Sequence, residues 1–268
     1  MSVPHHFAIT SPVEYAVLAG VGLAAGLVGG LVGIGGSVIM IPAMIILLGP
    51  HQHMYQASAM VVNVAVALPA AARHKAAGAL RMDVFRVMLP VTLVAIVAGV
   101  LLSNRFEQRT LQTVFGIFLV FVAADSSIKA LRRPESESAA PPKVSWFRSG
   151  TVGTAMGFFG GLLGVGGGAI AVPLAQMIMK LPIRNAIAAS ASVMAITAGI
   201  GAAIKISTLG EHGEAWQNAI ILALILAPSS MLGGHFGAGL THTLPTRAVR
   251  IVFAVVMIAA AVRLVLSG

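Results

Sequence analysis

Cysteine is absent from this 268-residue sequence, and charged residues are scarce. The lack of cysteine excludes disulfide bonds and thiolate metal sites. Asp, Glu, Lys and Arg make up 9% of the chain and hydrophobic residues 57%, whereas soluble domains carry about 25% charged residues. Because its mean hydropathy is +0.94, we expect the chain in a lipid bilayer rather than in water.

Carboxylates are nearly absent from the long apolar runs. The Asp and Glu residues outside the middle of the chain lie near predicted helix ends or in predicted loops: Glu14, Asp83, Glu107, Asp125, Glu211 and Glu214. Cation transporters and proton pumps usually carry Asp or Glu inside the membrane. Their scarcity therefore favours an anionic or neutral substrate.

Motifs for nucleotide-driven or enzymatic chemistry are also missing. The glycine-rich runs have no GxxxxGK[ST] lysine to hold phosphates, and neither an HExxH motif nor an intramembrane carboxylate pair is present. The two histidines at His51 and His53 are too short a pattern for a metal site. We therefore expect no enzyme activity, no cofactor and no metal.

The net charge of +9 comes from basic residues that cluster in loops between apolar runs. This distribution is typical of the positive-inside pattern of membrane proteins, so nucleic acid is not an expected partner. The expected partners are the lipid bilayer and a small anionic substrate, and a homo-oligomer remains open.

The apolar runs predict membrane-spanning helices and an all-α fold. No Asp, Glu, Lys or Arg occurs from Tyr15 to Ala72, and one spanning helix needs roughly 20 apolar residues. Charge gaps and helix breakers predict eight spanning helices at 15–32, 55–72, 84–103, 110–128, 149–164, 186–204, 215–239 and 247–266. Two shorter apolar pieces, at 37–48 and 168–179, would each be about 18 Å long and are predicted to be half-helices. The N-terminal stretch has no Lys or Arg and no clear small-residue cleavage site, so we expect the first helix to be retained.

The chain repeats itself. A shift of 131 residues lays GLAAGLVGGLVGIGGSVIMIP, residues 22–42, on GTAMGFFGGLLGVGGGAIAVP, residues 153–173, and 11 of the 21 positions are identical. A shift of 132 residues then pairs Ser58 with Ser190, Arg73 with Lys205 and Gly78 with Gly210. Repetition at a fixed spacing indicates two related structural units.

The repeat divides the chain into two halves with a linker between them. We expect a first transmembrane repeat at 1–131, a flexible cytoplasmic linker at 132–148 and a second transmembrane repeat at 149–268. The Pro, Ser and charge content of the linker leaves too few apolar residues to bury a core.

The relative orientation of the halves depends on whether each glycine-broken segment crosses the membrane or turns back. Turning back gives inverted repeats with 13 of the 17 Lys and Arg residues on one side, whereas crossing gives parallel repeats with 11. The positive-inside rule favours inversion, but 15–32 is nearly long enough to cross, which favours the parallel alternative. We expect about eight transmembrane helices in two homologous repeats, each with a glycine-broken helix and a half-helix, in the inverted arrangement.

The glycine motifs GGLVGIGGS, residues 29–37, and GGLLGVGGG, residues 160–168, are predicted to break their helices, since each Gly costs about 1 kcal/mol relative to Ala. Broken helices inside membranes line cavities, and transporters use them as substrate sites. The half-helices that follow would present unpaired N–H groups and a positive dipole end to an anion. The motif residues expected to bind substrate are Gly33, Gly35, Gly36, Ser37, Gly164, Gly166, Gly167 and Gly168.

The glycines spaced by four residues have a different predicted use. Glycines at this spacing allow close packing of membrane helices. The set comprises Gly22, Gly26, Gly30, Gly153, Gly157 and Gly161.

Several polar side chains within the apolar helices are further candidates. Ser58, Asn63, Ser190 and Ser192 could bond substrate oxygens, although interhelical and backbone bonding is the commoner use of such residues. Arg73 and Lys205 end two repeat-related helices and could serve as gates or anion access points; snorkelling anchors are the alternative. His235 is a weaker candidate for proton coupling, with packing as the commoner role.

The two copies GGLVGIGGSVIMIP and GGLLGVGGGAIAVP resemble the duplicated motif of the TauE/SafE sulfite exporters, and the resemblance covers essentially the whole chain. It implies a multi-pass protein of the bacterial inner membrane that moves sulfite, organosulfonates or related anions. The function we expect is secondary export of a small anion by alternating access around the two motifs. The alternatives are a channel-like anion conductor and a non-transporting membrane subunit.

Overall fold

The computed structural model describes residues 11–32, 36–131, 142–240, 251, 254, 255 and 257–262. This part of the chain is helical and contains no strand. Its elements are α1 (Pro12–Val32), α2 (Ser37–Leu48), α3 (Gln52–Ala76), α4 (Met82–Arg105), α5 (Gln108–Leu131), α6 (Trp146–Leu163), α7 (Gly168–Met179), α8 (Ile183–Ser207), η1 (Leu209–His212) and α9 (Trp216–Leu240).

The predicted half-helices are confirmed at the same residues as α2 and α7. Glycine motifs precede both helices and short polar or proline-containing turns follow them, which is why the sequence marks their ends so sharply. The predicted longer helices before residue 241 are also present, extended by up to four residues at their ends.

Six of the described helices are long and apolar enough to cross a membrane: Pro12–Gly29, Gln52–Ala76, Met82–Arg105, Gln108–Ile128, Ile183–Ser207 and Trp216–Phe236. The predicted span at 149–164 forms α6, which is not among these six; its glycines and Arg148 lower its hydropathy. The predicted span at 247–266 lies largely outside the described residues. The chain is therefore an all-helical, multi-pass membrane protein.

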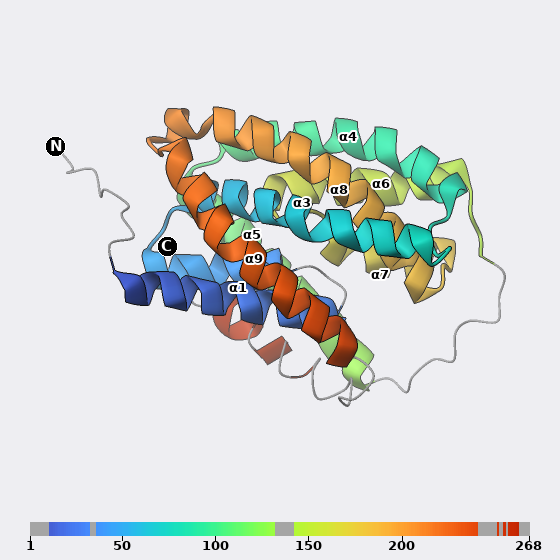
Figure 1. Cartoon of the computed structure of the whole chain (residues 1–268). Coiled ribbons are helices and arrows are strands. Elements are labelled where there is room, and N and C mark those ends of the chain that lie inside the picture. The colour runs from blue at the N-terminus through green and yellow to red at the C-terminus, as the bar shows by residue number, and fades with distance from the viewer. Residues whose placement is uncertain are drawn as a thin grey trace.

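The short helices fold back on the helices before them. Figure 1 shows α2 returning beside α1 and α7 returning beside α6, so that each pair forms a hairpin. The first hairpin helix of each half packs on the other half: α1 lies along α9, and α6 lies along α4. The two halves are thus interlocked, each holding the other's broken helix.

Helices α3 and α8 cross the centre of the protein and run antiparallel (Figure 1). At one end, Lys205 near the end of α8 contacts His53 near the start of α3, with 2.9 Å between Nζ and Nδ1. At the other, Asn185 near the start of α8 donates to the carbonyl of Ala79, just after α3, at 2.8 Å. We call these two ends the His53 end and the linker end, since Lys143, within the predicted linker at 132–148, also lies at the second one.

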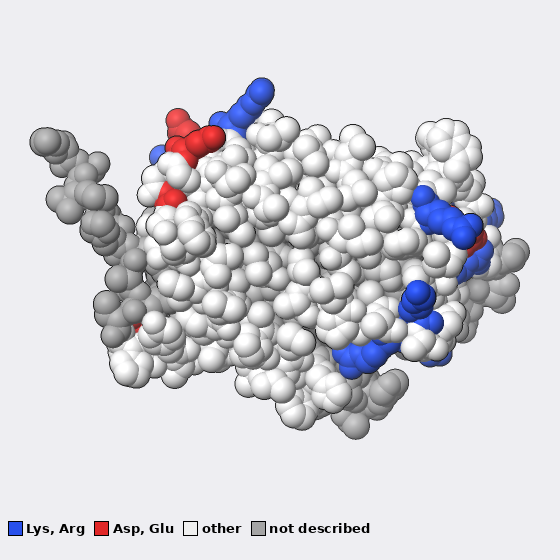
Figure 2. Space-filling view, turned by 45° about the horizontal axis from the view of Figure 1, so that its top comes forward, with Lys and Arg blue, Asp and Glu red and all other residues white. Residues whose placement is uncertain are grey.

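The two ends differ in charge. Figure 2 shows an uncharged belt between two charged ends, one mainly basic and the other carrying most of the visible acidic residues. The linker end holds Arg73, Lys75, Arg81, Arg86, Lys143, Arg148, Lys180 and Arg184. The His53 end holds Arg105, Glu107, Arg109, Lys205, Glu211 and Glu214. The belt has the composition of a lipid-facing surface.

Glycines allow the close contact between the interlocked helices. A Cβ on Gly26 would overlap the carbonyl oxygen of Ser230 in α9, and a Cβ on Gly161 would overlap that of Ile96 in α4. Gly22, Gly153 and Gly157 meet the facing helix in the same way. The predicted packing role of these five glycines is confirmed, and Gly30 lies where side-chain positions are outside the described residues.

Candidate anion site between the glycine motifs

The second glycine motif breaks the chain between α6 and α7. Gly164, Gly166 and Gly167 have φ angles of +74°, +69° and +76°, a left-handed region that favours glycine over every other residue. These angles turn the chain back within four residues. Helix α7 begins at Gly168 without a side-chain cap, and the first N–H groups of a helix have no acceptor within the helix itself, so the start of α7 points donors into the interior.

The first glycine motif meets the second one. The hydroxyl of Ser37, the first residue of α2, donates to the carbonyl oxygen of Val165 at 3.0 Å although 128 residues separate them. Ser37 is 1% exposed, so this contact lies in the interior. Gly36 precedes α2, and Gly33 and Gly35 lie outside the described residues.

Asn63 of α3 faces this break. Its Nδ2 atom has no hydrogen-bond partner among the described residues, and the residue is 4% exposed. A Cβ placed on Gly166 would lie 2.7 Å from that Nδ2 atom, which shows that the amide points at the glycine. A buried amide without a partner costs about 1–3 kcal/mol, and such a group calls for an explanation.

The predicted serines divide between two roles. Ser192 of α8 is 7% exposed and its hydroxyl has no partner in the described structure, so it remains a candidate. Ser58 instead donates to the carbonyl oxygens of Met54 and Ala219, at 3.0 and 2.9 Å, and so joins α3 to α9. Ser190 is buried in α8, and Gly168 begins α7.

Gln56 is a site residue that sequence reasoning missed. Its Nε2 atom donates to the carbonyl oxygen of Leu162 at 3.1 Å, and its Oε1 atom accepts from Ser103 at 3.1 Å. Its side chain also packs on Gly164, where a Cβ would lie 2.7 Å away. The sequence did offer one signal. Gln56 follows Gln52 by one helical turn in an uncharged stretch, where a buried amide needs hydrogen-bond partners.

The two predicted basic residues lie at opposite ends, away from the glycine break. Lys205 is 1% exposed and hydrogen-bonds to neutral side chains at the His53 end. Arg73 is exposed at the linker end, where its Nη1 atom lies 3.4 Å from Nδ1 of His235. The structure therefore brings together the glycines of the second motif, Ser37 and Asn63. Both cations lie outside that group.

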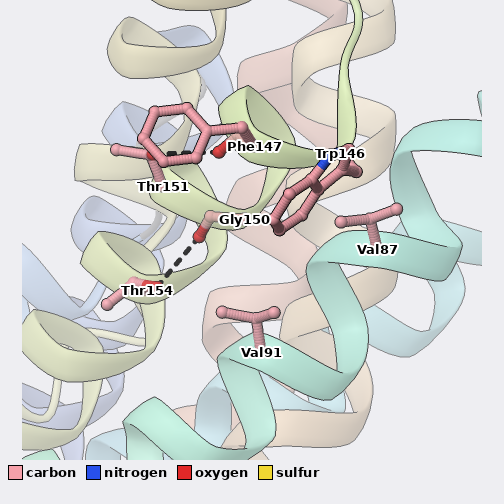
Figure 3. Close-up of a pocket in the computed structure, with 7 residues that line it drawn as sticks. All are labelled: Val87, Val91, Trp146, Phe147, Gly150, Thr151 and Thr154. Atoms are coloured by element: carbon pink, nitrogen blue, oxygen red, sulfur yellow. Dashed lines mark hydrogen bonds between the residues drawn. The ribbon is translucent and has the colours of Figure 1, made fainter.

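A hollow of about 270 Å³ on the surface between α4 and α6 is a different feature (Figure 3). Val87, Val91, Trp146 and Phe147 supply most of its lining. The hydroxyls of the two threonines that line it donate to backbone carbonyls in their own helix, at 2.9 Å each (Figure 3). Its lining is mainly apolar and its threonine hydroxyls are already bonded within their own helix, so we do not place substrate there.

Helices that break at buried glycines inside a membrane protein are typical of membrane transporters with discontinuous helices. Residues 18–264 match the sulfite exporter TauE/SafE family. Since the match covers most of the chain, this protein belongs to that family.

Individual relatives are distant and vary in length. The chain is 27% identical to the probable membrane transporter protein MamO of Magnetospirillum gryphiswaldense over 90% of this chain and 43% of that protein. It is 24% identical to the probable membrane transporter protein YunE of Bacillus subtilis, over 95% of this chain and 98% of that protein. The chain thus spans less than half of the MamO protein but nearly all of YunE. No solved structure matches the chain.

Proposed function

We propose that this protein is a secondary transporter that exports a small anion, sulfite or an organosulfonate, by alternating access around the two glycine motifs. One observation carries the proposal: the uncapped start of α7 and the amide nitrogen of Asn63, which has no partner among the described residues, face the same buried break. All of these groups are hydrogen-bond donors. Donors without a buried acceptor suit an anion, since the dipole of α7 also points its positive end there.

The substrate class follows from the family and from the donors. A sulfite or sulfonate group presents oxygen acceptors in several directions, which can meet donors from the backbone of 166–169, from Asn63 and from Ser192. These donors are neutral, so the site would select by hydrogen bonding rather than by an ion pair. The name of the family supports sulfite, and neutral donors of this kind suit small oxyanions in general.

Transport itself is the first test. Purified protein in liposomes should take up labelled methanesulfonate or sulfite faster than empty liposomes, and the flux should saturate and show counterflow. Counterflow distinguishes a carrier from the channel-like alternative, because a channel has no site that carries bound substrate alternately to each side. If none of sulfite, sulfate and methanesulfonate crosses faster than in empty liposomes, the proposed function fails.

Asn63→Ala should weaken anion binding by about 10-fold, because a hydrogen bond to a charged group contributes about 1.5–3 kcal/mol. Titration calorimetry of the detergent-solubilised protein measures the affinity directly. The matched control is Ser58→Ala in the same helix, whose hydroxyl bonds only to carbonyl oxygens and whose loss should leave affinity within about 2-fold. Equal effects of the two variants would remove Asn63 from the site.

We further propose that the two repeats are inverted, with residues 1–131 and 149–268 as the repeats and 132–148 as a cytoplasmic linker. The antiparallel course of α3 and α8 supports this, as does the hairpin shape of α1–α2 and α6–α7, which return the chain to the side where it started. The basic linker end would then face the cytoplasm by the positive-inside rule. The bacterial inner membrane is the location we propose.

Topology is testable at two repeat-related glycines. Gly78 lies at the linker end and Gly210 at the His53 end, and a Cβ at either meets nothing within 4 Å. The chain contains no other thiol, so Gly78→Cys and Gly210→Cys each give a single labelling site. Inverted repeats predict that a membrane-impermeant maleimide labels Gly210→Cys from outside whole cells and Gly78→Cys only after the membrane is opened. Labelling of both from the same side would support parallel repeats instead.

A further inference from the structure

The His53 end holds a buried lysine with an unusual set of partners. Lys205 is 1% exposed, and its ammonium lies 2.8 Å from Ser103 Oγ, 2.8 Å from Asn104 Oδ1 and 2.9 Å from His53 Nδ1. An ammonium has three N–H donors, so these three acceptors use all of them. The Nε2 atom of His53 lies 3.2 Å from the carbonyl oxygen of Phe106, which suits a neutral ring that donates there and accepts from Lys205.

No carboxylate compensates this charge in the described part of the chain. Lys205 takes part in no ion pair there, and the nearby Glu214 pairs with His51 at 2.6 Å. His212 stacks on His53 with ring centres 3.7 Å apart, so the remaining neighbour is another basic side chain. Isolating a charge from water and from an opposite charge costs several kcal/mol. A lysine that only anchored a helix end would reach water, and Lys205 does not.

A hydrogen-bond chain joins this ammonium to the glycine break. Lys205 donates to Ser103 Oγ, and Ser103 donates in turn to Gln56 Oε1 at 3.1 Å. The Nε2 atom of Gln56 then donates to the carbonyl oxygen of Leu162, two residues before Gly164. Each group accepts from the one before it and donates to the next, so a change at Lys205 alters the partners of the second glycine motif.

The same bonds tie three helices together at this end. His53 belongs to α3, Ser103 and Asn104 to α4, and Lys205 to α8. The repeat-related Arg73 has no such arrangement, since it is exposed and its side chain meets His235 only at 3.4 Å. In this structure, Lys205 is buried and joins the helices at the His53 end, whereas its counterpart Arg73 at the linker end is exposed to solvent.

We propose that Lys205 is a second, transient anion-binding site, on the route from the glycine break to the His53 end. An oxyanion arriving there replaces Ser103, Asn104 and His53 as the acceptors of the ammonium. The ends of α3, α4 and α8 then lose the bonds that join them, and this end opens. The proposal rests on the proposed function, since it takes the transported anion as the ligand.

Lys205→Gln tests this proposal by separating binding from release. The expected result is an affinity for methanesulfonate within about 2-fold of the unmodified protein, because the glycine site is intact, with a maximal transport rate at least about 10-fold lower. Calorimetry and liposome flux measure the two quantities. Arg109→Gln is the matched control, since Arg109 is an exposed cation at the same end, and its rate should not change.

Lys205→Cys allows the charge to be restored. In a chain without other cysteines, 2-bromoethylamine converts this residue into a lysine analogue, whereas iodoacetamide adds a neutral group of similar length. Mass spectrometry follows the extent of modification, and we expect only the aminoethylated protein to recover transport.

Three results would overturn the second site: unchanged transport by Lys205→Gln, a loss of affinity as large as that of Asn63→Ala, or no recovery after aminoethylation of folded protein. Melting temperature and gel filtration establish folding for each variant. Failure of the unmodified protein to bind or move any of the three anions would be a different outcome. It would remove the proposed function and, with it, the ligand named here.

Discussion

Replacing Gly166 with alanine is expected to reduce anion transport at least 100-fold while the protein still folds. The added methyl group would lie 2.5 Å from the sulfur of Met194 and 2.7 Å from Nδ2 of Asn63, so it would occupy the space between the free amide and the backbone donors. It would also force an L-residue to adopt a φ of +69°, at a cost of about 1–2 kcal/mol. Transport in liposomes and affinity by calorimetry should fall together.

Gly78→Ala separates the effect on the site from the effect on the backbone. Gly78 has a φ of +66° and a Cβ there meets nothing within 4 Å, so its substitution carries a similar backbone cost without filling any site. Transport by Gly78→Ala should remain within about 2-fold of the unmodified protein after correction for the amount of folded protein. A folded Gly166→Ala variant that transports as well as Gly78→Ala would exclude the glycine break as the substrate site.

The sequence was sufficient to predict the helices because their ends carry strong local signals. The half-helices begin at Ser37 and Gly168, directly after runs of glycine, and the structure places both starts at those residues. Local signals are enough here because glycine, proline and charge act on their own stretch of chain. The predicted number of eight spans was less secure, since α6 combines a helical pattern with a glycine content that lowers its hydropathy.

The use of individual polar residues could not be predicted in the same way. Ser58 and Asn63 lie in one helix, five residues or about 140° apart around its axis. Ser58 finds the carbonyl oxygen of Ala219 in α9, whereas Asn63 points at Gly166 and stays unpartnered. Contacts between residues more than 100 positions apart decide which face of α3 meets another helix and which face meets the glycine break.

The sequence repeat does not predict that its two basic residues, Arg73 and Lys205, differ in burial and in partners. Arg73 and Lys205 occupy equivalent positions, but the shift of 132 residues that relates them also relates His235 to Ser103. Ser103 offers a small hydroxyl that accepts from Lys205 and lets it remain buried, whereas the ring of His235 leaves Arg73 exposed. Divergence of the partner, rather than of the cation, makes the two ends unlike.

Gly161→Val is expected to prevent stable folding, in contrast to Gly166→Ala. Gly161 faces α4, where a Cβ would overlap the carbonyl oxygen of Ile96 and lie 2.9 Å from the backbone nitrogen of Val100. Backbone atoms of a packed helix cannot move aside as a side chain can, so the cost should reach the upper end of the about 1–3 kcal/mol typical of overpacking. We expect an apparent melting temperature lower by about 5–10 °C, or little folded protein at all, by gel filtration of a fluorescent fusion.

Gly150→Val is the control in the same helix, since a Cβ on Gly150 meets nothing within 4 Å and the two substitutions change helix propensity equally. Its melting temperature should stay within about 2 °C of the unmodified protein. A stable Gly161→Val protein would mean that α4 and α6 can separate at this contact. Loss of folding by Gly161→Val and loss of transport by a folded Gly166→Ala would together assign different roles to two glycines five residues apart: one holds the halves together, and the other keeps the anion site open.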